Sequence, residues 1–580
     1  MRGRFNLLLV LFLSVLFISS CTYKRNPTEV VVWQLADPGV INPVTAADAV
    51  AYEIDNNVFQ PLLNFDYRTL KLVPILADSL PQVRADSAGH MYITYELRKE
   101  AKWDNGTPIT AKDVEFTFKA ACNPGVNDAP LKTTLDLLSD LILYPDNPRK
   151  ITFVFKARYN LAVETTGTNT CVLPEYAYDP KKYMEGFTFK QMLNDTALAH
   201  DPKMMAFAND FNSEKYQRDT TGVNGSGAYQ FVEWTTGQRV VLRKKRGWWG
   251  DALAGTNCFF EAYPDKIVYQ VVNDQTTALV SLKAGNLDVM KAIKPQDFTD
   301  LSKSDKFTAN FNTLTPLMFA YTYLGINMKE PKLADVHTRQ ALAHLVDVKR
   351  IIQDVYYGYG QQVTGGISPM DSLDYNSDIK PYEYNLDSAK ALLAAAGWTA
   401  SEGDGILYKV IDGKKTPFTI DFLVNQGADV RKKVALIFKE EARKVGIDVN
   451  IVVKEFNVFQ GLLKKHEFDM YTSGWVFQPG QQDFKQVFYS TSALDEGSNH
   501  EGFGDATSDA LIDSMRVELD VKKRAGMEKR LQVIMHDRCG YIFLLAPKAL
   551  IAISKKFSNA YASSNNPFFW EAGFKAAGEK

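Results

Sequence analysis

The chain has 580 residues, of which 46% are hydrophobic and 23% charged, and its formal net charge at pH 7 is −2. This near-neutral balance excludes the strongly basic surface that is typical of nucleic-acid-binding proteins, and the length allows roughly two to four domains with buried cores. Aromatic side chains make up 12% of the residues, which suits a cleft that grips a ligand and equally suits a large core.

The N-terminus has the pattern of a secretory signal that ends in a lipidation site. Two arginines precede an apolar run from Leu7 to Ile18, which is too short to span a bilayer stably. The run ends in Ile-Ser-Ser-Cys21, which resembles the bacterial lipobox, where the chain is cut before the cysteine and its thiol is acylated. We predict a signal peptide over 1–20 and a lipidated tether over 21–29; a plain secretory signal with a chance cysteine is the alternative.

Strands and helices alternate through the first half of the mature chain. A helix is expected after Thr110, where Thr110 and Asp113 form a capping box. A second helix begins after Asp274 and ends at Gly285. The polar stretch 179–224 has little periodicity and is expected to form surface excursions and loose helices. The expected strands are Val30–Trp33, Met91–Leu97, Lys150–Lys156, Ile267–Val272 and Leu287–Met290.

The second half continues the alternation. One long helix is expected from Asp335 through Val355, ended by Gly358, and another over Asp387–Ala396. Asp429 is expected to cap a helix that Gly446 ends. A shorter helix and two strands follow, over Val458–Lys465, Ile447–Val453 and Asp469–Trp475. Short loops punctuated by glycine between such units indicate an α/β protein with largely parallel sheets.

The sequence has no clear pattern for a metal site or a catalytic centre. It lacks a Gly-x-Ser-x-Gly, a His-Glu-x-x-His and a Walker motif. His337 and His344 share one helix face near Asp347, but such residues are more often solvated or hydrogen-bonded than metal-bound. We therefore predict no catalytic residue, no metal and no cofactor. Either free thiols or one or two disulfides are possible for the four later cysteines, Cys122, Cys171, Cys258 and Cys539.

Four stretches carry motifs that point to a family. They are Tyr92–Phe118, with Trp-Asp-Asn-Gly-Thr-Pro ahead of a capped helix; Gly225–Tyr229, reading Gly-Ser-Gly-Ala-Tyr and followed by Trp248-Trp249; Tyr323–Pro369, which begins Tyr-Leu-Gly-Ile-Asn-Met; and Ala389–Trp475, which ends in Gly-Trp. In this order the four stretches resemble the family 5 extracellular solute-binding proteins, the peptide, dipeptide and nickel receptors of bacterial ABC importers.

The resemblance implies an α/β fold of the type II periplasmic-binding-protein class. In this fold two lobes close on a ligand by hinge bending, and a small extra α+β domain is attached. We expect a discontinuous lobe I built from 30–66, 200–290 and 541–580, a small domain over 67–199, and a lobe II over 291–540.

The resemblance also implies where a ligand would sit. In peptide-binding members, the strand that ends in Gly-Trp lines the cleft, and an aspartate three residues later pairs with the amino terminus of the ligand. That position is Gln478 here, which offers hydrogen bonds but no countercharge; Asp483 is a further candidate for the charge. A core position for Trp475 is the alternative. The predicted ligand-binding residues are Gly474, Trp475, Val476, Gln478 and Asp483.

Together these features predict a substrate-binding lipoprotein of an ABC importer. It would capture a small solute, an oligopeptide or dipeptide, and deliver it to the permease and ATPase complex without catalysing a reaction. We expect a monomer in the periplasm or cell envelope, held on the membrane through Cys21, with no nucleic-acid partner. The alternatives are a lipoprotein of the same fold that serves signalling or envelope functions without transport, and a receptor for a non-peptide cargo such as a metal chelate.

Overall fold

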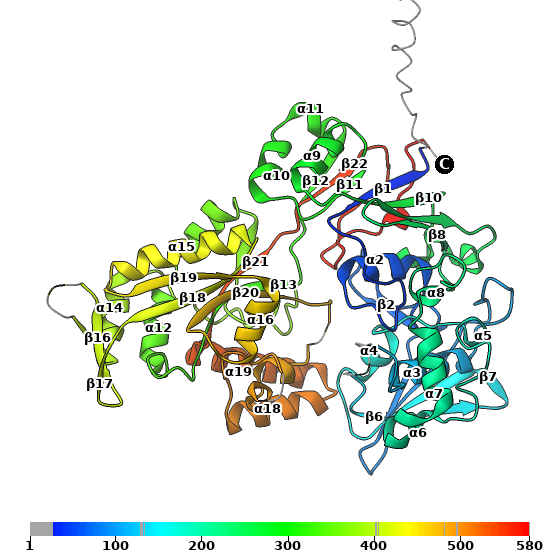
Figure 1. Ribbon diagram of the computed structural model, residues 1–580, viewed down its shortest axis with the longest axis horizontal. Coiled ribbons are helices and arrows are strands. Elements are labelled where there is room, and N and C mark those ends of the chain that lie inside the picture. The colour runs from blue at the N-terminus through cyan, green and yellow to red at the C-terminus, as the bar shows by residue number, and fades with distance from the viewer. Residues whose placement is uncertain are drawn as a thin grey trace, which may run out of the picture.

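The computed structural model describes residues 27–578 apart from 128–131, 133, 401, 402, 404, 481, 495 and 496. The predicted signal peptide and Cys21 lie outside these residues. Figure 1 shows two bodies of mixed α/β structure, one drawn at the right and top and one at the left, with a narrow connection between them. Within the described residues, none of the helices is long and apolar enough to cross a membrane.

The first body is built on a seven-stranded mixed sheet with the order β12-β22-β11-β1-β10-β9-β8. Its central strand β1 is buried along its whole length and pairs in parallel with β10 and β11, as expected for a strand covered on both faces. The strands of this sheet are β1 (Glu29–Gln34), β8 (Tyr229–Thr235), β9 (Arg239–Lys244), β10 (Lys266–Val271), β11 (Val289–Met290), β12 (Phe311–Leu314) and β22 (Ile551–Ser554). Its helices are α2 (Ala49–Val58), α9 (Gln275–Lys283), α10 (Pro295–Ser302) and α11 (Asp305–Thr308).

A four-stranded antiparallel sheet, β4-β5-β7-β6, extends the first body. Its core is continuous with that of the seven-stranded sheet, since Val30, Ile93 and Phe207 belong to one buried cluster. The elements here are β2 (Leu63–Phe65), β3 (Leu72–Pro74), β4 (Gln82–Ala85), β5 (Met91–Glu96), β6 (Leu138–Tyr144), β7 (Asn147–Phe155), α3 (Ala111–Cys122), α4 (Ala162–Gly167), α5 (Glu175–Tyr178), α6 (Phe189–Asn194), α7 (Pro202–Phe211) and α8 (Glu214–Gln217).

The second body is built on a six-stranded mixed sheet with the order β14-β21-β13-β20-β18-β19. Apolar clusters cover both of its faces. Its strands are β13 (Ala320–Ile326), β14 (Gly360–Gln362), β18 (Thr419–Asn425), β19 (Asp448–Lys454), β20 (Met470–Val476) and β21 (Tyr541–Pro547), and a small separate sheet holds β15 (Thr399–Ala400), β16 (Leu407–Ile411) and β17 (Lys414–Pro417).

The helices of the second body surround this sheet, and short single-turn elements complete the fold. The helices are α12 (Val336–His344), α13 (Val348–Arg350), the π-helical η5 (Ile351–Val355), α14 (Leu386–Ala395), α15 (Asp429–Arg443), α16 (Phe456–Lys464), α17 (Lys485–Phe488), α18 (Ala506–Val517) and α19 (Val521–Arg538). The short 3₁₀ turns are η2 (Thr196–His200), η3 (Trp249–Leu253), η4 (Cys258–Phe260), η6 (Ser490–Ala493) and η7 (Glu571–Gly573).

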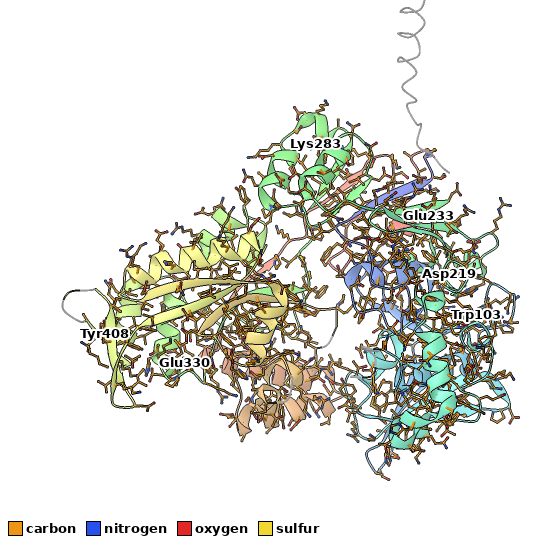
Figure 2. The ribbon with its side chains drawn as sticks, viewed as in Figure 1. Trp103, Asp219, Glu233, Lys283, Glu330 and Tyr408 are labelled. Atoms are coloured by element: carbon orange, nitrogen blue, oxygen red, sulfur yellow. The ribbon has the colours of Figure 1, made fainter. Side chains whose placement is uncertain are left out.

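Two chain segments connect the bodies and lie side by side. One runs from β12 to β13 and the other from β21 to β22. Leu317 and Lys548 form an antiparallel bridge, and the amide of Met318 donates to the carbonyl of Pro547 at 2.9 Å. A connection made of two paired strands allows one body to rotate against the other, the geometry of a hinge. In Figure 2, Glu330 and Tyr408 lie in the second body and Trp103 in the first.

The sheet pairing differs from the predicted lobe boundaries at two places. Phe311–Leu314, which the sequence assigned to lobe II, pairs with β22 in the first sheet. Tyr541–Pro547, which it assigned to lobe I, pairs with β13 and β14 in the second sheet. The chain therefore changes body just after β12 and just after β21.

Most of the predicted elements are present, and the helix caps predicted in the first half of the chain are confirmed. Thr110 and Asp113 form the capping box of α3, and the Asp274 carboxylate accepts from the amide of Thr277 at the start of α9. Gly285 has the positive φ of +75° that a residue just past a helix end needs. All four described cysteines are buried free thiols, so the disulfide alternative does not apply to them.

Four predictions about these elements were wrong. The helix expected from Asp335 to Val355 is broken, because Asp347 accepts from the amide of Arg350 and starts a new turn there. Asp429 is the first residue of α15 and makes no cap. The stretch 179–224 is not loose, since α7 buries one apolar face. The sheets are mixed, because hairpins such as β8–β9 and the returning strands β21 and β22 pair antiparallel.

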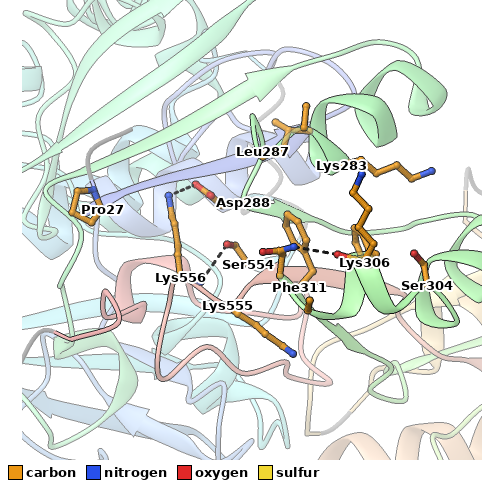
Figure 3. Close-up of a pocket in the computed structure, with 15 residues that line it drawn as sticks. Pro27, Lys283, Leu287, Asp288, Ser304, Lys306, Phe311, Ser554, Lys555 and Lys556 are labelled. Carbon is orange, nitrogen blue, oxygen red and sulfur yellow. Dashed lines mark hydrogen bonds and ion pairs between the residues drawn. The ribbon is translucent and has the colours of Figure 1, made fainter. Parts of the chain in front are cut away.

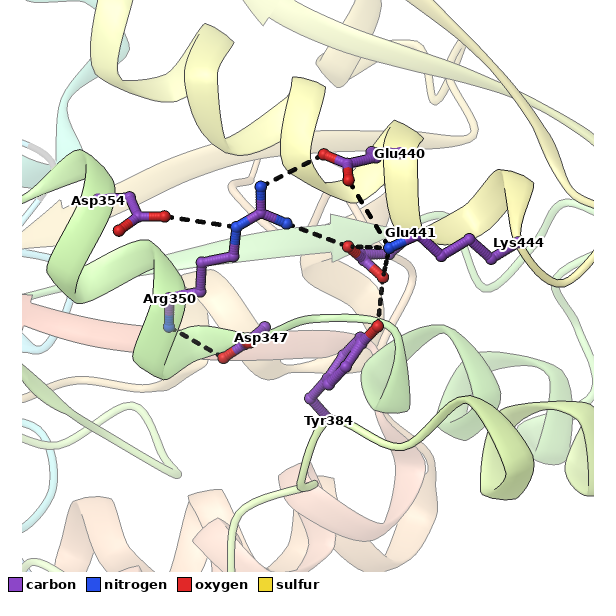
Figure 4. Close-up of polar contacts among 7 residues, drawn as sticks. All are labelled: Asp347, Arg350, Asp354, Tyr384, Glu440, Glu441 and Lys444. Carbon is purple, nitrogen blue, oxygen red and sulfur yellow. Dashed lines mark hydrogen bonds and ion pairs between the residues drawn. The ribbon is translucent and has the colours of Figure 1, made fainter.

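An ion network fixes η5 and α13 against α15 in the second body (Figure 4). The guanidinium of Arg350 lies 3.1 Å from the carboxylate of Glu441, which also accepts from Lys444 at 2.8 Å and from the hydroxyl of Tyr384. Glu441 is buried, so these donors replace the water that its charge would otherwise require. The network holds the broken helix at the place where the sequence predicted a continuous one.

Candidate ligand-binding cleft

A cavity of ≈ 800 Å³ lies where the two bodies face each other. Residues of both bodies line it, which is the arrangement of a site that closes on a ligand. Those from the first body are Phe65, Thr134, Asp136, Tyr159, Leu161, Glu164, Thr165, Thr168 and Asn169. Those from the second body include Tyr321, Trp475, Val476, Phe477, Gln478, Pro479, Gln482, Asp483, Lys485 and Arg516.

Strand β20 places the predicted aromatic residue at the cavity wall. The strand is buried at Met470 and emerges toward its end, so that Trp475 is half-buried and Val476 is 59% exposed. The indole of Trp475 approaches the hydroxyl of Tyr541 at 3.5 Å, while the rest of the ring faces the cavity. An apolar residue that is exposed at the end of a central strand is available to a ligand.

Of the two predicted ligand-binding residues Gly474 and Gln478, only Gln478 lines the cavity. Gly474 does not line the cavity; a Cβ there would lie 2.8 Å from the carbonyl oxygen of Tyr321, so the glycine permits β20 to approach β13. Gln478 lines the cavity and is exposed. Its amide can therefore offer a donor and an acceptor to a ligand.

The Asp483 carboxylate is already engaged. It accepts from Arg516 at 3.1 Å, from the hydroxyl of Tyr159 at 3.3 Å and from the amide of Lys485 at 2.9 Å. Tyr159 belongs to the first body, so this carboxylate links the two walls of the cavity. The neighbouring amide of Asn160 donates to the carbonyl of Arg516 at 2.8 Å and adds a second link. Asp483 therefore holds the two bodies together at the edge of the cavity.

The wall contributed by the first body was not found by sequence reasoning. It includes α4 and the residues on either side of it, among them Tyr159, Glu164 and Thr168. The hydroxyl of Tyr95 on β5 anchors α4 through contacts to the carbonyl of Val163 at 3.2 Å and to the hydroxyl of Thr166 at 2.9 Å. No pattern in the sequence singles out this six-residue helix, because its role follows from its place opposite β20.

A buried carboxyl supports β20 from behind. Glu501 is fully buried and accepts from the hydroxyl of Tyr471, which contacts the hydroxyl of Tyr323 at 3.0 Å. Burial raises the pKa of the Glu501 carboxyl to about 8, so that it is mostly neutral at pH 7. Burial also lowers the pKa of the adjacent His500 to about 4. The ring stack of Tyr323 on Tyr541, with centroids 3.9 Å apart, connects this group to the indole of Trp475.

A second cavity, of ≈ 780 Å³, lies in the first body beside α9 and α11 (Figure 3). Lys283, Lys306 and Lys555 line it, and Lys556 lines it while pairing with Asp288 at 2.7 Å. All of its lining residues come from the first body. Hinge rotation would not close it, and so the cavity between the bodies is the better candidate for the site.

Comparisons with known proteins identify the family of the chain. Residues 71–495 match the family described as "Bacterial extracellular solute-binding proteins, family 5 Middle". The chain belongs to this family. It is 27% identical over 574 residues to the oligopeptide-binding protein AppA of Bacillus subtilis, covering 94% of each chain. The fold is the type II periplasmic-binding fold.

Solved structures of two relatives share this fold. AppA of Bacillus subtilis in complex with a nonapeptide superimposes with a TM-score of 0.71 at 23% identity, covering 95% of this chain and 99% of that one. NikA from Brucella suis in complex with Fe(III)-EDTA gives a TM-score of 0.76 at 19% identity, covering 94% and 99%. AppA and NikA thus hold chemically different ligands on a similar fold, and a shared fold does not by itself fix the ligand.

The histidines of interest are engaged in local contacts. His344 places its Nδ1 2.7 Å from the carbonyl of Glu383, and His337 lies 3.8 Å from Asp335. Across the part of the chain that the structure describes, no group of three or more His, Cys, Asp or Glu side chains could hold a metal ion.

Proposed function

We propose that this chain is the peptide-binding receptor of an ABC importer and captures its ligand between β20 and α4. The observation that carries the proposal is the interlobe cavity: its ≈ 800 Å³ suits an extended short peptide, and residues of both bodies line it. Trp475 and Phe477 supply apolar surface, and Gln478, Thr165 and Thr168 supply hydrogen-bonding groups that a peptide backbone can use. The receptor performs no covalent chemistry.

The two bodies correspond to the two lobes of the proposed receptor. We propose lobe I as 29–314 with 551–578, including the small four-stranded domain, and lobe II as 320–547. These ranges replace the ones expected from sequence and follow the pairing of β12 and β21. We further propose that Cys21 carries the lipid anchor, that residues up to Thr28 form the tether, and that the mature receptor is a monomer on the cell envelope.

A thermal-shift screen tests the function. Purified protein is mixed with pools of di- to pentapeptides, with sugars and with metal chelates, and the melting temperature is recorded. A ligand at about 100 times its dissociation constant should add about 2.7 kcal/mol to the free energy of unfolding. Recovery of the unchanged peptide after binding supports a receptor. A response to metal chelates alone, or cleavage of the peptide, would refute the proposal.

A further inference from the structure

The cavity lining contains an unequal set of charges. Asp136, Glu164 and Asp483 are its acids, and Lys485 and Arg516 are its bases. Asp483 and Arg516 neutralise each other at 3.1 Å. Asp136 is exposed and can remain hydrated without a partner. Glu164, in the wall formed by the first body, is half-buried. Its carboxylate is therefore the charge in the lining that needs a partner.

The environment of Glu164 offers it little compensation. Within the described residues, no other residue donates a hydrogen bond to its carboxylate and no cation lies within 4 Å of it. Arg524 acts on it only from a distance, because the guanidinium of Arg524 lies 3.5 Å from Glu528 and donates to the carbonyl of Glu518 at 3.3 Å. Burial raises the pKa of Glu164 above its ordinary value, which is the sign of a carboxylate that lacks water and donors.

The position of Glu164 is fixed rather than adaptable. Tyr95 holds α4 at Val163 and Thr166, on both sides of Glu164. The end of the helix packs tightly, since a Cβ on Gly167 would lie 2.7 Å from a methyl carbon of Leu63. A ligand that closes the cavity removes more water from this carboxylate, and a buried charge without a partner is costly. A ligand with a positive group at this point offsets that cost more fully than a neutral one.

We propose that Glu164 is the specificity-determining residue that selects ligands with a positively charged group, an ammonium or a guanidinium, and pairs with that group on closure. This inference rests on the proposed peptide function and names the residue that recognises the charge. Lys485 is not the partner of the Glu164 carboxylate. Its ammonium lies 5.2 Å from the ring centroid of Tyr489 and makes no ion pair with Glu164. Neutral and anionic ligands are disfavoured, since they leave the carboxylate buried and unpaired.

The test compares two peptide pools on the full-length protein by isothermal titration calorimetry. The first pool holds tri- to pentapeptides of uncharged residues with a free amino terminus, and the second holds the same peptides N-acetylated. Wild-type protein should bind the free-amine pool more tightly by about 10- to 100-fold, the range for a hydrogen-bonded charge. Glu164→Gln should lose most of this preference, and Glu164→Asp should keep part of it.

A matched control separates charge recognition from structural damage. Glu175 is also half-buried, its pKa is also raised by burial, and it lies outside the cavity, so Glu175→Gln should keep the wild-type preference. Equal binding of both pools by wild-type protein, or an unchanged preference in a folded Glu164→Gln variant, refutes the role proposed for Glu164. Either result leaves the proposed peptide function standing. Failure of wild-type protein to bind either pool refutes the proposed peptide function and this inference with it.

Discussion

Glu501 should make the stability of the second body fall as the pH rises. Its carboxyl is fully buried behind β20, and one of its oxygens has no hydrogen-bond partner among the described residues. Burial raises its pKa from the usual 4.5 to about 8. The folded protein therefore keeps a proton on Glu501 over a pH range in which the unfolded chain has lost it.

The sign and size of the effect follow from proton linkage. Between pH 4.5 and pH 8 unfolding releases this proton, so the contribution of Glu501 to the free energy of unfolding falls by about 1.4 kcal/mol per pH unit. Below pH 4.5 both states are protonated and the contribution no longer changes. Over the whole window the loss is about 5 kcal/mol if the carboxyl stays in its buried position. Glu501→Gln keeps an acceptor for Tyr471 and removes the titration.

Guanidinium unfolding of the wild type and of Glu501→Gln at pH 5, 6, 7, 8 and 9 measures this directly. The variant should gain stability relative to the wild type as the pH rises to about 8, and the difference should then level off. Exposed Glu467, which lies just before β20, provides the control Glu467→Gln, which makes the same substitution at the surface and leaves the buried carboxyl in place. Parallel stability curves for the wild type and Glu501→Gln would show that Glu501 is ionised in the folded protein.

Three further predictions concern the ligand, the ion network and the anchor. Trp475→Ala should weaken peptide binding by about 10- to 100-fold in calorimetry, as for a central aromatic contact, and remove the ligand-induced fluorescence change with little change in melting temperature; unchanged affinity would move the site elsewhere. Burial opposes ionisation of Glu441, but hydrogen bonds from Lys444 and Tyr384 outweigh it and lower its pKa. Glu441→Gln should therefore cost about 1–3 kcal/mol at pH 7, and this cost should shrink as the pH falls below 4.5; a cost that stays constant with pH would contradict the charge network. Cys21→Ser should move the protein from the membrane to the soluble fraction after cell fractionation, because a tether without acyl chains has no membrane affinity of its own; retention on the membrane would disprove the anchor.

The elements that local patterns specify were predictable from sequence. Strand β20 was expected at 469–475, where Tyr471, Thr472 and Trp475 favour a strand, and the structure has it at 470–476. The apolar face of α7 was missed, although Met204, Phe207 and Phe211 recur at helical spacing and are buried. The break at Asp347 was not anticipated. An aspartate within a stretch of helical apolar spacing can either lie inside a continuous helix or cap the start of a new one.

Half of the candidate site depends on contacts that no local pattern records. Tyr159 and Asp483 lie 324 positions apart in the chain, and only the fold brings the hydroxyl within 3.3 Å of the carboxylate. The same holds for Arg516, which neutralises Asp483 and so removes the countercharge that the sequence offered for a ligand amine. The wall formed by β20 could be predicted from the sequence. The α4 wall and the pairing of the charges could not, because they depend on how the two bodies are placed in the fold.

Few contacts link the two walls at this edge of the cavity. Among the described residues, two hydrogen bonds cross at this edge, from Tyr159 to Asp483 at 3.3 Å and from Asn160 to Arg516 at 2.8 Å. Each contributes about 0.5–1.5 kcal/mol net, so together they shift the equilibrium between open and closed forms by roughly 5- to 150-fold. A ligand can close the receptor only through contacts that exist in the closed form and not in the open one. Groups on opposite walls, Trp475 on one and Glu164 on the other, satisfy this condition because a single ligand reaches both only when the bodies approach. Selectivity and closure therefore depend on the same residues, and a ligand that binds β20 alone would leave the receptor open.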